Sequence, residues 1–214
     1  MTGPTLDRFH ACFDRLPLVA ILRGVRPDEV EAIGEALVDA GFTLIEVPLN
    51  SPEPFDSIGR LARRLGDRAL VGAGTVLSPE AVDAVLAAGG AMVIAPNMNP
   101  AVIAGAAAHG LPALPGIFTP TEAFAALAAG AAALQLFPAE GSSPAALKAM
   151  RAVLPRETRM LPVGGVAPET MRPWVEAGAN GFGLGSALYK PGRTAAGVHE
   201  AALTFVKEWA AITA

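Results

Sequence analysis

The residues best suited to chemistry stand near the ends of short apolar runs. Glu46 lies inside the run 44–49, where an unpaired carboxylate would be costly, and Gln135 lies inside the run 133–137. A carboxyl group in an apolar pocket has a raised pKa and suits general acid–base catalysis. The structural alternatives are an ion pair between Glu46 and Arg23 across adjacent strands, and a hydrogen-bonded core amide for Gln135.

Small residues cluster at three further points of the chain. Gly164-Gly165 and Gly185-Ser186 each follow an apolar run, and their backbone N–H groups suit close approach to an anion such as phosphate. Thr75 ends a turn of small residues, where its hydroxyl either orients a substrate group or caps the turn. These positions predict a binding site, provided that the fold brings the run ends together.

A repeat organises the chain after residue 17. Helix-like apolar segments end on a small residue and a glycine suited to the left-handed position after a helix, at Gly41, Gly66, Gly89, Gly110, Gly130 and Gly178. A strand-like run follows each glycine, so that the repeat is one βα unit. Eight strands are predicted, at residues 18–23, 43–49, 69–73, 91–95, 112–115, 133–137, 159–163 and 181–185.

Eight apolar strands that alternate with helices indicate an α/β protein with a parallel sheet covered by helices. A closed (β/α)8 TIM barrel is the simplest arrangement, and an open doubly wound sheet is the alternative. The first βα turn, Arg23-Gly24-Val25, lacks the glycine-rich dinucleotide fingerprint of the open fold. We expect a helical segment at 1–16 that closes the bottom of a single barrel domain at 17–214, with chemistry at the carboxyl ends of the strands.

Composition excludes several classes of function. A net charge of -4 without a basic cluster argues against nucleic acid, and the absence of a run of about 18 apolar residues argues against a membrane span. The start of the chain lacks the pattern of a signal peptide, which favours a cytoplasmic protein. The single Cys12 and the scattered His10, His109 and His199 have no ligand spacing, so no metal site is expected.

Five motifs together resemble the aldolases for 2-keto-3-deoxy-6-phosphogluconate and 6-phosphogalactonate. The resemblance spans residues 17–209 and rests on the segments at 20–24 (AILRG), 46–52 (EVPLNSP), 72–77 (GAGTVL), 137–140 (FPAE) and 163–166 (VGGV). It implies a barrel, usually trimeric, that cleaves a phosphorylated sugar acid to pyruvate and glyceraldehyde 3-phosphate without a cofactor. Asn50 and Val163 resemble the galactonate branch, since the gluconate branch tends to have Arg and Thr there.

The resemblance also implies roles for individual residues. Glu46 would be the acid–base group, acting through a water, while Arg23 and Thr75 would bind the pyruvate carboxylate. Asn50 would contribute to substrate preference, Pro96 and Phe137 would wall the pocket, and the phosphate would be held by Gly164, Gly165, Gly185 and Ser186.

The catalytic position of Gln135 departs from the family pattern. The family forms a Schiff base through a lysine at this place, and an amide nitrogen cannot replace it because its lone pair is delocalised. Three explanations stay open: an engineered replacement in a trapped enzyme or trimeric scaffold, a natural paralogue that binds phosphorylated sugar acids without cleaving them, or a different step that uses Glu46 with a metal or an oxyanion site. We expect lost or impaired imine chemistry and retained ligand binding.

Overall fold

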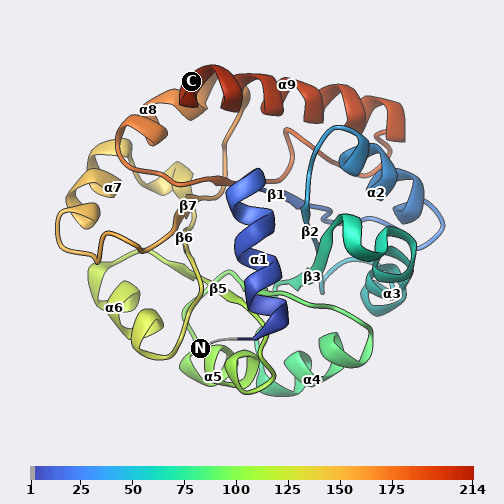
Figure 1. The fold of residues 1–214 in the computed structure, drawn as a ribbon, viewed down its shortest axis with the longest axis horizontal. Coiled ribbons are helices and arrows are strands. Elements are labelled where there is room, and N and C mark those ends of the chain that lie inside the picture. Colours follow the sequence, from blue (N-terminus) through green and yellow to red (C-terminus); the bar gives the residue numbers. More distant parts are fainter. Residues whose placement is uncertain (1–2) are drawn as a thin grey trace.

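The computed structural model describes residues 3–214 and shows a ring of parallel strands surrounded by helices (Figure 1). The strands are β1 (Leu18–Ile21), β2 (Leu44–Pro48), β3 (Leu70–Gly74), β4 (Val93–Ala95), β5 (Ala113–Ile117), β6 (Leu134–Leu136), β7 (Met160–Pro162) and β8 (Phe182–Leu184). The helices are α1 (Pro4–Arg15), α2 (Val30–Asp39), α3 (Pro54–Leu65), α4 (Pro79–Ala87), α5 (Pro100–Ala108), α6 (Pro120–Ala128), α7 (Pro144–Arg151), α8 (Met171–Glu176) and α9 (Ala195–Thr213). Three 3₁₀ turns complete the elements: η1 (Gly66–Arg68), η2 (Ala139–Gly141) and η3 (Pro168–Thr170).

The strand order closes the sheet. The parallel ladder runs β7-β6-β5-β4-β3-β2-β1-β8, and a bridge between Val163 and Gly183 joins its two ends. The fold is therefore a (β/α)8 barrel, as the repeat predicted, and the open doubly wound alternative is wrong. In this ring β2 and β6 are separated by three strands on either side, so they face each other across the lumen.

The predicted helix stops are confirmed by the backbone. All six predicted stop glycines have positive φ, between 55° and 106°: Gly41, Gly66, Gly89, Gly110, Gly130 and Gly178. Side chains cap the starts of five helices by accepting a backbone hydrogen bond, at Ser78, Asn99, Thr119, Ser143 and Thr194. Each cap fixes the residue at which the loop before its helix ends, and these loops surround the mouth of the barrel.

Two predicted strands end two residues away from the observed ends: β1 stops at Ile21 rather than at residue 23, and β5 runs on past residue 115. The sequence interpretation stopped the fifth strand at Pro115, whereas β5 continues to Ile117. Proline removes one donor from the ladder, but Gly116 and Ile117 still pair with Gln135 and Leu136 of β6. These two pairs keep β5 continuous although the proline donates no backbone hydrogen bond.

Two apolar clusters fill the molecule on either side of the strands. The larger lies between the strands and the outer helices, and it takes alternate strand residues such as Leu18 and Ala20. The smaller fills the lumen, with Val19, Leu44 and Ala133 from the strands. Helix α1 adds Leu6, Phe9 and Phe13 to this lumen cluster, and it crosses the ring at the amino-terminal ends of the strands (Figure 1). The boundary between residues 1–16 and 17–214 stays a prediction.

Candidate active site at the carboxyl ends of the strands

Strand alternation directs Glu46 and Gln135 into the lumen. Leu44 and Ala133 belong to the lumen cluster, and side chains two residues further along a strand point to the same face. Both polar residues are buried, each with 3% of its surface exposed. They therefore lie on opposite walls of the barrel, on β2 and β6, next to the apolar lumen cluster.

The two residues line one small inner chamber of about 30 Å³. It contains six of the predicted site residues, and its complete lining is Ile21, Arg23, Glu46, Thr75, Ile94, Ala95, Pro96, Gln135, Phe137 and Val163. Thr75 reaches the chamber from a left-handed backbone position with φ 56°. The structure thus brings these six residues together around one chamber.

An outer basin of about 290 Å³ adjoins the chamber. Its lining includes all four residues predicted to hold phosphate, Gly164, Gly165, Gly185 and Ser186. The two spaces share four lining residues, Ile21, Arg23, Phe137 and Val163. Chamber and basin are consequently the two ends of a single cleft, with the acid at the bottom and the glycine turns at the mouth.

The carboxyl of Glu46 is held in an apolar and tightly fitted place. Burial raises the pKa of Glu46 to about 8, and the positive charge of Arg23 opposes this rise. A Cβ atom on Gly74 would lie 1.7 Å from Glu46 Oε2, so that only glycine leaves room for the carboxyl at this point of β3. Because a carboxyl with this pKa gains and loses a proton near neutrality, Glu46 suits acid–base work.

Arg23 does not form the ion pair with Glu46 that was the structural alternative to a catalytic role. Among residues 3–214, no carboxylate oxygen lies within 4 Å of a guanidinium nitrogen of Arg23. Its Nη1 instead donates to Asn50 Oδ1 at 3.1 Å. Asn50 lies outside the lining of both spaces, so it reaches the cleft only through Arg23.

The turn between β7 and η3 carries an unexpected neighbour. Gly164 and Gly165 have φ values of 107° and 65°, and the side chain of Glu140 lies directly over both. A Cβ atom on Gly164 would lie 2.1 Å from Glu140 Oε2. The lining of the basin predicted to hold an anion therefore contains a carboxylate as well as the cations of Arg23 and Lys190.

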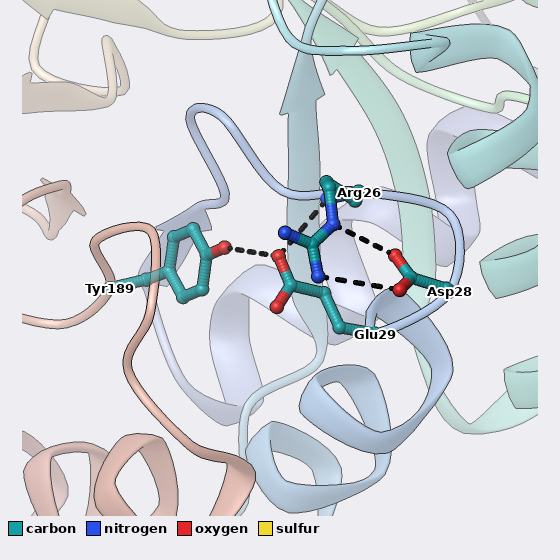
Figure 2. Close-up of polar contacts among 4 residues, drawn as sticks. All are labelled: Arg26, Asp28, Glu29 and Tyr189. Carbon is teal, nitrogen blue, oxygen red and sulfur yellow. Dashed lines mark hydrogen bonds and ion pairs between the residues drawn. The ribbon is translucent and has the colours of Figure 1, made fainter.

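Tyr189 lines the basin and joins two loops. Its hydroxyl donates to Glu29 Oε1 at 3.1 Å, and the same oxygen accepts the backbone N–H of Arg26 at 3.2 Å (Figure 2). Arg26 Nε in turn donates to Asp28 Oδ1 at 3.0 Å. Burial, followed by the bond to Glu29, raises the pKa of the Tyr189 phenol, so it stays a donor. The loops after β1 and β8 are thereby fixed to each other.

Sequence reasoning missed Glu140, Tyr189 and Lys190 as members of the site. All three lie in loops or turns after strands, where no apolar periodicity marks the direction of a side chain. Glu140 did stand in one of the quoted motifs, and its position in η2, the turn that follows β6, was the available signal.

The inner chamber has no amine in its lining. Lys148 lies on α7 and Lys207 on α9, both in the outer ring of helices, and Lys190 lines only the outer basin. Within residues 3–214, no cluster of three or more His, Cys, Asp or Glu side chains is arranged to hold a metal. No helix in that range is both long and apolar enough to cross a membrane.

The comparisons with known proteins agree on one family. The family model described as KDPG and KHG aldolase matches residues 10–200. The 2-dehydro-3-deoxy-6-phosphogalactonate aldolase of Escherichia coli (strain K12) is 47% identical over 195 residues, which cover 91% of this chain and 95% of the relative. A solved structure described as native KDPGal has a TM-score of 0.92 at 46% identity, covering 93% of this chain and 97% of the other.

A more distant structure bears on the chemistry of such sites. The KDPG aldolase of Legionella pneumophila, solved with pyruvate captured as a covalent carbinolamine intermediate, has a TM-score of 0.76 at 25% identity. It covers 98% of each chain.

Proposed function

This chain belongs to the KDPG and KHG aldolase family, and we propose that its cleft binds a phosphorylated 2-keto-3-deoxy sugar acid of the galactonate type. The resemblance read from the motifs is confirmed by this membership. The proposed reaction type is that of an aldolase-type lyase, which yields pyruvate and glyceraldehyde 3-phosphate. In this sequence we propose that the imine step is lost or impaired, because Gln135 stands in the place of the family's lysine.

The observation that carries the proposal is the two-part cleft. Its inner end offers the acid Glu46 and its outer end offers the glycine turns, and the shared lining of Arg23 and Phe137 connects them. A sugar acid with a keto group near one end and a phosphate at the other matches this polarity. We assign Arg23 and Thr75 to the carboxylate end, and Pro96 and Phe137 to the walls.

The phosphate is assigned to the outer basin, on Gly164, Gly165, Gly185 and Ser186. Successive glycines let an anion approach backbone N–H groups without side-chain interference. Lys190, which lines the same basin, adds a positive charge. These features support a phosphate site at the loops after β7 and β8, where barrels of this kind often bind one.

Loss of cleavage follows from the position of Gln135. Carbon–carbon cleavage next to a keto group needs an electron sink, which the family obtains from an imine and which the amide of Gln135 cannot form. No lysine lines the inner chamber to take its place. A non-catalytic binding paralogue or a trimeric scaffold variant is accordingly the second candidate function.

The galactonate preference is supported by two residues. Asn50 accepts a hydrogen bond from Arg23, and Val163 lines both parts of the cleft. Both resemble the galactonate branch, and the E. coli relative named above is a phosphogalactonate aldolase. Competition between the two C4 epimers for the site of this chain tests the preference, since equal affinities would contradict it.

We also propose a cytoplasmic homotrimer. The family resemblance implies the trimer, and large apolar side chains such as Phe118 and Phe124 are exposed on the single chain, at 42% and 46%. Sedimentation equilibrium should give about three times the chain mass of 21.8 kDa, and a monomer mass would contradict the assembly. Recovery of the native protein in a membrane or periplasmic fraction would contradict the location.

The test of the proposed function restores the missing amine. The change Gln135→Lys should release pyruvate from 2-dehydro-3-deoxy-6-phosphogalactonate, whereas the native chain should release far less. A lysine variant at position 135 that folds, binds the sugar acid and releases no pyruvate would count against the aldolase assignment. Failure of the native chain to bind either epimer would count against the ligand assignment.

A further inference from the structure

Two polar atoms in the inner chamber have no hydrogen-bond partner among residues 3–214. They are Glu46 Oε2, on the β2 wall, and Gln135 Nε2, on the opposite β6 wall. In the same range only the hydroxyl of Ser57, on outer helix α3, shares this condition. An unpaired buried polar group costs about 1–3 kcal/mol, so a ligand that pairs with both atoms recovers this free energy.

The two atoms have complementary chemistry. The amide Nε2 donates hydrogen bonds, and an ionised carboxylate oxygen accepts a proton. A 2-oxo acid presents the matching pair: a keto oxygen that accepts a hydrogen bond and, on the neighbouring carbon, a proton that becomes acidic when that oxygen is polarised. The hydrogen-bonding chemistry of the two atoms therefore matches the keto end of such an acid without a covalent bond.

The charge around Glu46 also suits proton removal. Arg23 is the other charged residue in the chamber lining, and the remaining lining residues are neutral. Burial raises the pKa of Glu46 to about 8, which makes its carboxylate a stronger base than an exposed one. Arg23 faces the chamber from the end of β1 and stabilises negative charge that develops there.

We propose that this chain exchanges the C3 protons of a bound 2-oxo acid with solvent through an enolate that needs no imine. The inference rests on the proposed function, since the cleft must first admit a 2-oxo acid. It goes beyond that function by assigning Gln135 as a catalytic hydrogen-bond donor in its own right. The amide then acts in a different reaction from the one that a lysine would support.

The proposed exchange needs only the bound acid, Glu46, Gln135 and solvent. The Glu46 carboxylate takes a proton from C3, and the C–H electron pair becomes the second bond between C2 and C3. The carbonyl π electrons move to the keto oxygen, which Gln135 Nε2–H stabilises as it becomes negative. Glu46 exchanges its proton with solvent, and the reverse step returns a solvent proton to C3. No carbon–carbon bond breaks and no oxidant is needed.

The experiment follows the methyl signal of pyruvate by proton NMR in deuterated buffer. The native chain should remove this signal faster than buffer alone. Glu46→Gln should reduce the rate to that of the buffer, and Gln135→Leu should lower it about 100-fold, the usual effect of losing one oxyanion donor. Ser57→Ala is the matched control, because it removes the other unpaired buried polar group and should leave the exchange rate unchanged.

Two further readouts make each outcome decisive. The exchange rate should rise with pH through about 8, where Glu46 ionises. If Gln135→Leu does not unfold cooperatively, Gln135→Met, which has a similar length, replaces it in the comparison. A native rate no faster than that of Glu46→Gln, or a donor variant with the native rate, overturns the proposal.

Ligand-observed NMR of pyruvate separates this inference from the function on which it rests. Pyruvate that binds without exchange overturns the inference and leaves the ligand assignment intact. If neither pyruvate nor the phosphorylated sugar acid binds, both the inference and the proposed function are wrong.

Discussion

At the scale of single residues, three polar side chains define the site: two have a buried atom without a hydrogen-bond partner, and one lies over a glycine turn. Glu46 is a buried acid, Gln135 an unpaired buried amide, and Glu140 a carboxylate lying over the turn that is assigned to phosphate. The first two were predictable, because a polar residue inside an apolar strand is conspicuous. Glu140 was not, because its direction depends on how the turn after β6 folds back over the Gly164 turn.

The raised pKa of Glu46 predicts a dependence of stability on pH. Between the ordinary value of 4.5 and about 8 the unfolded chain loses this proton while the folded chain keeps it. The contribution of Glu46 to the free energy of unfolding is therefore fully present below pH 4.5 and is lost as pH rises through about 8. At about 1.4 kcal/mol for each pKa unit, the loss amounts to roughly 5 kcal/mol at most.

The variant Glu46→Gln should remove this loss, since its amide stays neutral. Its free energy of unfolding should exceed that of the native chain increasingly from pH 5 to pH 9, as measured by urea denaturation. Glu169→Gln changes an exposed carboxyl and serves as the control. Parallel pH profiles for the native chain and Glu46→Gln would contradict the burial of a titrating acid.

The carboxylate of Glu140 should compete with anions for the glycine turn. Glu140→Ala removes a negative charge beside Gly164 and Gly165 and should tighten binding of inorganic phosphate about tenfold, or about 1.4 kcal/mol. Titration calorimetry at low ionic strength measures the effect, and Glu140→Gln separates charge from shape. Weaker binding by both variants would show that Glu140 supports the phosphate site.

At the scale of elements, close packing between strands decides where glycine is required. Gly74 ends β3 against the Glu46 carboxyl, whereas Gly105 lies in α5 with its nearest neighbour, the Pro79 Cβ, 3.9 Å from an added methyl group. The sequence predicted a strand at 69–73, one residue short of Gly74, and a helix-like segment that stops at Gly110. It did not distinguish these two glycines, because the distinction depends on the register between strands, which the sequence pattern left open.

The same substitution should therefore have opposite effects at the two positions. Gly105→Ala should stabilise the chain by about 1 kcal/mol, since alanine favours a helix interior. Gly74→Ala should destabilise it by about 2 kcal/mol or more and abolish proton exchange, since its Cβ occupies the place of the carboxyl. The midpoint of thermal unfolding of each variant measures its effect, and equal shifts of the two midpoints would contradict the assigned packing.

At the scale of the whole molecule, the repeat of eight βα units and the missing dinucleotide fingerprint favoured a closed barrel over an open sheet. Eight βα units leave no unpaired edge once β7 and β8 meet, and closure places every strand end at a common mouth. The depth of the cleft was not predictable, because it depends on which side chains fill the lumen. Here α1 and the lumen cluster fill the lower part, so the chamber begins at Glu46 and Gln135.

The central claim is that residue 135 is where a keto acid would be bound covalently, and that glutamine prevents this bond. Incubation with pyruvate and borohydride, followed by mass spectrometry of the intact protein and its peptides, tests it most directly. The native chain should keep its mass, and Gln135→Lys should gain one reduced pyruvate on residue 135. An adduct on any lysine of the native chain, or a folded lysine variant that stays unmodified, would contradict the account.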